Sequence, residues 1–200
     1  MDAEGLAAPM VAGHSFGGLL AMRLAAAAPE RVAALILLDP AVALPPERCA
    51  AEAEAVRRDE GWASADEARA ERLAMRPAHA GDTVAEDLAT FLAVGPDGRH
   101  RFRFSRPAVI CAWSEMAAPP PSLAAFRGPV LLVPALRERY VTDALRAALA
   151  ADLGERLVER GIDAGHMLFW DAREELAAIL RELLSPGAPA SSTPARGPAA

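Results

Sequence analysis

Ser15 stands in a sequence pattern that could make its hydroxyl a nucleophile. Residues 11–18 read VAGHSFGG, which contains the motif G-x-S-x-G with Ser15 at its centre and a further glycine behind it. An apolar run precedes the motif, and an alanine- and leucine-rich helical pattern follows it over residues 19–28. A serine on a sharp turn between a strand and a helix is exposed at the carboxyl end of the strand. We therefore predict that Ser15 is a nucleophile and that the backbone N–H of Phe16 stabilises an oxyanion.

A base must lie within hydrogen-bond reach of the serine, because a hydroxyl is a weak nucleophile at neutral pH. His166 fits this role, since it follows the last predicted strand in the segment GHMLFWD, and sites gather in loops at the carboxyl edge of a parallel sheet. The other histidines fit less well, because His79 and His100 lie in a polar stretch and His14 is the variable position of the motif. We predict His166 as the base and His14 as a substrate contact.

The acid that orients this base could be either of two carboxylates. Asp39 ends the second predicted strand, directly before a proline, and Glu138 follows the third predicted strand in the segment ALRERY. Both positions are expected at the carboxyl edge of the sheet. Each also has a purely structural interpretation, as a turn residue for Asp39 and as a salt-bridged surface residue for Glu138. The residues alone leave both candidates open.

These side chains need strands and helices that bring them together. Apolar runs and turn signals predict the order strand–helix–strand, a long insertion, and then strand–helix–strand–helix. The predicted elements are strands 8–13, 31–38, 130–133 and 156–162, and helices 19–28, 143–153 and 174–184. The second strand is apolar throughout, which is typical of strands covered on both faces of a parallel sheet. The sequence therefore predicts an α/β fold with a mostly parallel sheet.

The insertion differs in character from the rest of the chain. We expect core segments at 1–42 and 128–184, a helical lid at 43–127, and a disordered tail rich in Pro, Ala and Ser at 185–200. Charges alternating with alanines predict solvated helices in the lid over 47–58 and 65–75, followed by a short strand at 101–104 and a helix at 108–116. Trp113 and Met116 in the lid, and Met167 beside the base, are candidates for substrate contacts. They indicate a largely apolar pocket for a small molecule.

The composition excludes several other classes of function. The net charge is −6 and the isoelectric point about 5.3, so we expect no nucleic-acid partner. The absence of lysine excludes Schiff-base chemistry. No apolar run reaches the roughly 18 residues of a membrane span, so we expect no membrane partner but a cytoplasmic protein, with Cys49 and Cys111 as free thiols. We expect no metal and no cofactor, because a nucleophile, a base and an acid supply the chemistry themselves.

The chain resembles the α/β-hydrolase fold superfamily. The resemblance covers residues 6–184 and rests on the segments VAGHSFGG, RVAALILLDPA, GPVLLVPALRERYVT and GIDAGHMLFWD. It implies a partial α/β-hydrolase fold, a half-sheet of the family's strands 5–8 with a helical lid, and a triad of Ser15, an acid and His166. Most members carry the acid where Glu138 stands, but a subset has an aspartate where Asp39 stands and often reads Y-V-S or Y-V-T, as residues 140–142 do. The resemblance favours Asp39 and keeps Glu138 second.

The resemblance also implies an activity, that of a serine hydrolase acting through an acyl-enzyme on a small, apolar ester or a related acyl or carbonyl substrate. A carboxylic ester is favoured, and lactones, thioesters and carbon–carbon hydrolase substrates stay open. A serine nucleophile argues against the dehalogenases and epoxide hydrolases of this fold, which use an aspartate. The family's first four strands have no counterpart here, so we expect a chain truncated at its N-terminus, with half of the oxyanion hole. Its strand at 8–13 would then be an open apolar edge that invites self-association. The alternative is a non-catalytic relic or binding protein that keeps a lidded pocket.

Overall fold

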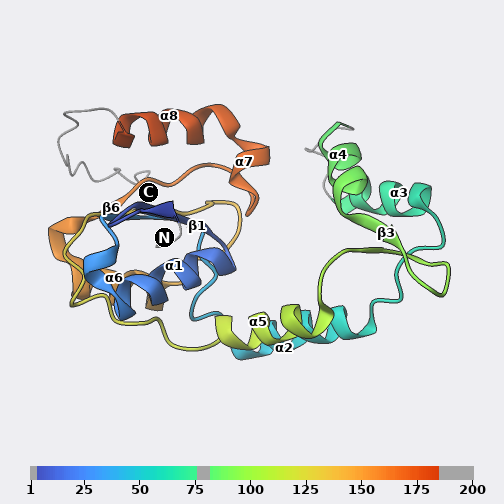
Figure 1. The fold of residues 1–200 in the computed structure, drawn as a ribbon, viewed down its shortest axis with the longest axis horizontal. Helices are drawn as coiled ribbons and strands as arrows, with labels where there is room; N and C mark the ends of the chain where they lie inside the picture. Colours follow the sequence, from blue (N-terminus) through green and yellow to red (C-terminus); the bar gives the residue numbers. More distant parts are fainter. Residues whose placement is uncertain (1–3, 76–81, 185–200) are drawn as a thin grey trace, which may run out of the picture. The chain divides into compact units, whose positions relative to one another are not determined.

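The computed structural model describes residues 4–75 and 82–184, and the chain divides into two compact units. The core unit consists of residues 4–43, 119–168 and 172–184, and the insertion unit of residues 44–75, 82–118 and 169–171. The core unit contains strands β1 (Met10–His14), β2 (Ala34–Leu38), β5 (Val130–Val133) and β6 (Leu157–Glu159), and helices α1 (Phe16–Ala27), α6 (Asp143–Leu153) and α8 (Arg173–Leu184) (Figure 1). Two single 3-10 turns, Pro29–Arg31 and Gly154–Arg156, precede β2 and β6.

The four strands of the core unit form one sheet in the order β1-β2-β5-β6, with all neighbours parallel. The register pairs Gly13 with Leu37 and Leu37 with Leu132, so the strands end at a common edge. All four residues of β5 and the first four of β2 are buried, as expected for central parallel strands. The predicted α/β fold with a parallel half-sheet is confirmed.

Helices cover both faces of this sheet. In Figure 1, α1 and α6 lie on one side of the strands and α8 lies on the other. Leu19 and Met22 of α1 are fully buried, and α6 buries Leu145, Leu149 and Leu153, which recur every four residues on one helix face. The resulting core fixes the carboxyl ends of the strands against one another.

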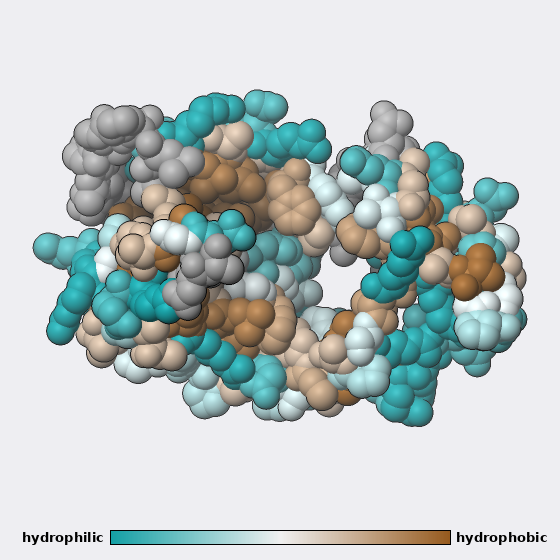
Figure 2. All heavy atoms as spheres, viewed as in Figure 1, coloured by the Kyte–Doolittle hydropathy of each residue, from teal (hydrophilic) through white to brown (hydrophobic). Residues whose placement is uncertain are grey.

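β1 is the edge strand of the sheet, and its burial pattern differs from that of the central strands. Met10 and Ala12 are exposed, and Leu6 before the strand and Leu20 on α1 are also exposed. Figure 2 shows hydrophobic atoms at the surface of this unit beside α8 and over α1. Among the described strands only β2 pairs with β1, and an edge strand of this kind favours pairing with another chain.

The insertion unit ends nine residues before the predicted end of the lid at residue 127. Residues 119–127 belong to the core unit, and the insertion ends at Ala118. Leu123 and Phe126 are fully buried there, the carboxylate of Asp152 accepts a hydrogen bond from the Leu123 N–H at 2.6 Å, and Arg156 donates to the Phe126 carbonyl. These two apolar side chains anchor the segment to the core unit. The predicted tail at 185–200 lies outside the described residues.

The insertion unit is mostly helical. It contains helices α2 (Pro46–Arg58), α3 (Ala65–Met75), α4 (Asp82–Phe91) and α5 (Arg106–Met116), and a hairpin of β3 (Leu92–Val94) and β4 (His100–Phe102). Ala68, Val84 and Leu88 form its small buried core, against which Trp62 and Phe102 pack. A four-residue helix, α7 (Leu168–Asp171), begins in the core unit and ends in the insertion unit.

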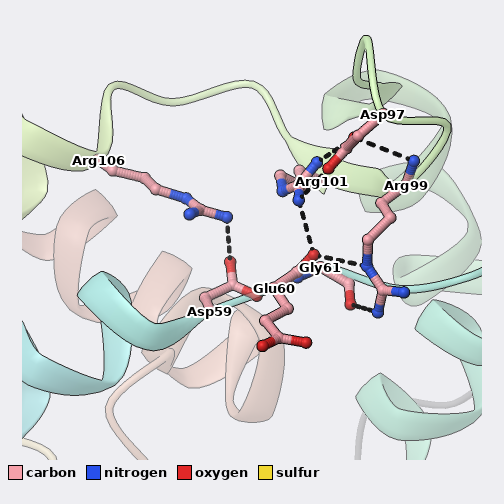
Figure 3. A network of polar contacts seen from close by, with 7 residues as sticks. All are labelled: Asp59, Glu60, Gly61, Asp97, Arg99, Arg101 and Arg106. Atoms are coloured by element: carbon pink, nitrogen blue, oxygen red, sulfur yellow. Dashed lines mark hydrogen bonds and ion pairs between the residues drawn. The ribbon is translucent and has the colours of Figure 1, made fainter.

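Arginine side chains attach the hairpin turn of the insertion unit to the segment after α2 (Figure 3). Arg99 donates to the carbonyls of Glu60 and Gly61 at 2.7 and 2.5 Å, and Arg101 donates to the carbonyl of Glu60 at 2.8 Å. Arg101 also forms a two-pronged ion pair with Asp97. These arginines therefore satisfy main-chain carbonyls and a carboxylate within their own unit.

None of the described helices has the length and apolar character that crossing a membrane requires.

Candidate active site

Ser15 occupies a sharp turn between β1 and α1. Its φ of 54° and ψ of −124° lie in a region that non-glycine residues rarely adopt, which indicates backbone strain at this position. The Ser15 N–H donates to the Leu38 carbonyl at 3.1 Å, and this bond ties the turn to the end of β2. A Cβ at Gly13 would lie 2.2 Å from the Gly17 carbonyl oxygen, so glycine is required where the turn closes on itself. The motif therefore forms the predicted strand–turn–helix.

His166 links the serine to one of the two candidate acids. Its Nε2 lies 2.9 Å from Ser15 Oγ, and its Nδ1 lies 2.6 Å from Asp39 Oδ2. A carboxylate oxygen can only accept, so Nδ1 donates its proton to Asp39. In the neutral ring, Nε2 is then bare and accepts from the Ser15 hydroxyl. The structure thus brings together three side chains that are far apart in the sequence.

Asp39 is fully buried, its main chain is held by the last residue of β5, and its side chain is held by the segment that follows β5. Its N–H donates to the Val133 carbonyl at 2.8 Å, and its Oδ1 accepts from the Ala135 N–H at 3.0 Å. A buried carboxylate is costly unless it is hydrogen-bonded, and here both oxygens have partners. The φ of Asp39 is 39°, so Asp39, like Ser15, has a positive φ that non-glycine residues rarely adopt.

Glu138 lies beside the same histidine but contacts a different part of it. Its Oε1 accepts a hydrogen bond of 3.0 Å from the main-chain N–H of His166. The ring nitrogen that faces an acid faces Asp39 instead. Of the two acids that the sequence left open, Asp39 therefore reaches the imidazole and Glu138 reaches the backbone.

Two aromatic rings lie against the imidazole of His166. The Tyr140 ring stacks on it with centroids 3.6 Å apart and planes 13° from parallel, and the His14 ring lies 4.6 Å away at 39°. His14 Nε2 also donates to the His166 carbonyl at 2.8 Å. Burial lowers the pKa of His14, and its hydrogen bond to His166 offsets this in part. Tyr140 was not predicted as a site residue, although the segment YVT that contains it supported the choice of Asp39.

The remaining predicted site residues fall into both units. Phe16 is the first residue of α1, directly after Ser15, and the first N–H groups of a helix have no acceptor within that helix. Met167 follows His166 and precedes α7. Trp113 and Met116 lie on α5 of the insertion unit, so their predicted contact with substrate stays a prediction. Of the other histidines, His100 lies in β4, and His79 lies outside the described residues.

Comparison with known proteins gives three kinds of similarity. The sequence model described as "Alpha/beta hydrolase family" matches residues 2–179. Lipase LipV of Mycobacterium tuberculosis (strain ATCC 25618 / H37Rv) is 40% identical over 193 residues, which are 93% of this chain and 72% of that protein. Among solved structures, E-2-(acetamidomethylene)succinate hydrolase aligns with a TM-score of 0.74 at 17% identity, over 92% of this chain and 69% of that one. A hydrolase from Pseudomonas aeruginosa PA01 aligns with a TM-score of 0.69 at 18% identity, over 92% and 68% of the two chains.

Proposed function

Because this chain belongs to the alpha/beta hydrolase family, we propose that it is a serine hydrolase that cleaves a small, apolar carboxylic ester through an acyl-enzyme on Ser15. Within this family, the chain is similar to proteins named lipase and esterase. The observation that carries the proposal is the position of His166, whose two ring nitrogens lie 2.9 Å from Ser15 Oγ and 2.6 Å from Asp39 Oδ2. A hydroxyl, an imidazole and a carboxylate in this order are the parts that nucleophilic acyl transfer needs.

In the acylation step, Ser15 Oγ attacks the ester carbonyl carbon while its proton passes to His166 Nε2. The carbonyl π electrons move to oxygen, which gives a tetrahedral oxyanion. The negative charge of Asp39 stabilises the imidazolium that forms, and its hydrogen bond to Nδ1 keeps Nε2 directed at the serine. The intermediate collapses with cleavage of the bond to the alkoxy oxygen, which leaves as an alcohol with the proton from Nε2.

In the deacylation step, water replaces the alcohol. His166 Nε2 takes a proton from the water as its oxygen attacks the acyl carbon, and a second tetrahedral intermediate forms. Its collapse returns the proton to Ser15 Oγ and releases the carboxylic acid. We assign the Phe16 N–H, at the start of α1, to the oxyanion in both steps, because a helix N-terminus directs N–H groups and a partial positive charge at that position.

The preference for an apolar ester has two supports. The similar protein from M. tuberculosis carries the name lipase, which is a name for an enzyme that acts on esters of apolar acids. The predicted substrate contacts Trp113, Met116 and Met167 are apolar side chains, which favour an apolar acyl or alcohol group. His14 is the polar member of the predicted set.

A fluorophosphonate probe, together with p-nitrophenyl esters of increasing acyl length, tests the proposal. We expect stoichiometric labelling of Ser15 and ester hydrolysis, both lost in Ser15→Ala and His166→Ala. Ser114→Ala is the matched control, because Ser114 is an exposed serine on α5, and it should label and hydrolyse as the wild type does. A folded wild-type protein that neither labels nor turns over any ester would overturn the proposal and favour a binding protein.

A further inference from the structure

The main chain of His166 is held on both sides by side chains from distant parts of the sequence. Glu138, in the segment after β5, accepts from its N–H at 3.0 Å, and His14, at the end of β1, donates to its carbonyl at 2.8 Å. These two residues come from different strand ends of the same sheet. Most hydrogen bonds between main-chain groups and side chains are local caps and turns, but these span 28 and 152 residues.

We propose that Glu138 and His14 are positioning residues, which hold the base His166 by its own main chain while Asp39 and Tyr140 hold its ring. This inference rests on the proposed function, because it assigns to His166 the role of base. Neither residue touches the reacting atoms in this assignment. Each acts through His166, so the expected effect of losing Glu138 is on the rate of the chemical step and not on the affinity for substrate. His14 is also a predicted substrate contact, so its positioning role is tested through kcat and the labelling rate.

The surroundings of His166 explain why its main chain needs these two hydrogen bonds. The residue lies outside any helix or strand, between the isolated bridge of Ile162 with Ala135 and the start of α7. Loops move more than the elements they connect. A base displaced by about 1 Å can lose on the order of 100-fold in rate, because proton transfer requires a short hydrogen bond to the serine. Two hydrogen bonds on opposite sides of the His166 main chain restrict that displacement.

The direction of each hydrogen bond defines what the two residues must supply. The His166 carbonyl can only accept, so His14 must carry a proton on Nε2, and the neutral ring with a bare Nδ1 meets this need. The lowered pKa of His14 agrees with a neutral ring. A charged His14 would place a positive charge 4.6 Å from the imidazole that itself becomes positive during catalysis.

Glu138 must supply an acceptor atom at the correct distance, and its negative charge is secondary. Two variants separate these properties. Glu138→Gln keeps a carbonyl oxygen at the same reach and removes the charge, whereas Glu138→Asp keeps the charge and withdraws the acceptor by one methylene group. If Glu138 were instead the acid of the triad, the loss of charge would be the damaging change.

The experiment compares kcat, KM and the rate of fluorophosphonate labelling of Ser15 in Glu138→Gln, Glu138→Asp and Glu138→Ala. We expect Glu138→Asp and Glu138→Ala to lose about 10-fold or more in kcat and in labelling rate with little change in KM, and Glu138→Gln to recover most of that loss. Glu155→Ala, at an exposed glutamate of the same unit, is the matched control and should match the wild type. His14→Gln, which retains an N–H donor, should likewise exceed His14→Ala.

Each outcome supports or overturns the inference. Equal rates for Glu138→Asp, Glu138→Gln and the control would overturn it while leaving the hydrolase intact. A loss in Glu138→Gln as large as that in Asp39→Asn would also overturn it, because Glu138 would then act through its charge. A wild-type protein without labelling or turnover is a different result, since it removes the proposed function itself. If Glu138→Ala does not fold, the comparison of Glu138→Gln with Glu138→Asp still tests whether Glu138 acts through its acceptor atom.

Discussion

Asp39 Oδ2 lies 2.6 Å from His166 Nδ1 although the two residues are separated by 127 positions in the sequence, and the aspartate is completely shielded from solvent. Its second oxygen accepts from the Ala135 N–H. These two hydrogen bonds fix the orientation of the Asp39 carboxylate, and the carboxylate in turn fixes the orientation of the His166 imidazole.

Replacement of Asp39 by Asn should lower kcat by about 10⁴-fold, because an amide can donate to Nδ1 and thereby favour the wrong tautomer of His166. Steady-state hydrolysis of p-nitrophenyl butyrate measures the effect, and circular dichroism checks the fold. A loss of less than about 10-fold in a folded variant would contradict the assignment of Asp39 as the acid.

Replacement of Gly13 by Ala should lower the free energy of unfolding by about 3 kcal/mol, because the new methyl group would lie 2.2 Å from the Gly17 carbonyl oxygen. Urea denaturation followed by fluorescence measures the change. Gly17→Ala is the matched control, since a Cβ at Gly17 meets nothing within 4 Å and should change the stability by less than about 1 kcal/mol. Equal effects of the two substitutions would show that the turn can open without cost.

The buried state of His14 predicts a pH dependence of folding stability. Because burial lowers the pKa of His14 below its ordinary value of 6.5, the unfolded chain binds more protons than the folded protein just below that pH. Stability should therefore fall as the pH falls from 6.5 through the folded-state pKa, and it should fall less in His14→Gln. Urea midpoints between pH 5 and 8 for both proteins measure the difference. Identical pH profiles would argue against a neutral, buried His14.

The exposed edge strand β1 predicts self-association. Met10 is 39% exposed on this strand, and Met10→Lys should reduce a concentration-dependent dimer, because a charged side chain on an edge opposes strand pairing. Sedimentation velocity at several concentrations measures this. Leu136→Lys is the matched control, since Leu136 is 60% exposed but does not lie on β1. A wild-type chain that stays monomeric at every concentration would contradict the prediction.

The predicted substrate contacts on α5 can be tested through the dependence of KM on acyl length. Trp113→Ala and Met116→Ala should raise KM several-fold for longer acyl esters and change it little for acetate, because they would remove apolar contact area. Cys111→Ser, at an exposed position of the same helix, serves as the control. KM values unchanged at every acyl length would remove these two residues from the binding surface.

Much of the fold could be predicted from the sequence, because buried parallel strands and their helices leave strong local patterns. Strand 130–133 and helix 143–153 begin and end where predicted. Helix α4 and the four-residue α7 were not predicted, and the strand expected at 156–162 covers only Leu157–Glu159. β6 and α7 have only three and four residues, and tertiary contacts decide such short elements more than local propensity does.

The turn around Ser15 could be predicted from the sequence, but the choice of the acid could not. The motif around Ser15 is local, so its turn could be predicted from consecutive residues. The choice between Asp39 and Glu138 could not be made from the residues alone, because both follow parallel strands at the same sheet edge. Which of them reaches Nδ1 depends on the direction of the chain after each strand, and that direction is visible only in the folded protein.

The short stretch between β5 and α6 contacts Asp39 and both the main chain and the ring of His166. Ala135 bonds to Asp39, Leu136 bonds to the Ile162 carbonyl, Glu138 bonds to the His166 N–H, and Tyr140 covers the imidazole. Inserting or deleting one residue here would shift all four contacts together, so this stretch should tolerate almost no change in length. Efforts to evolve new substrate ranges should leave it untouched and direct diversity to the 44–118 segment, whose folding contacts are largely its own.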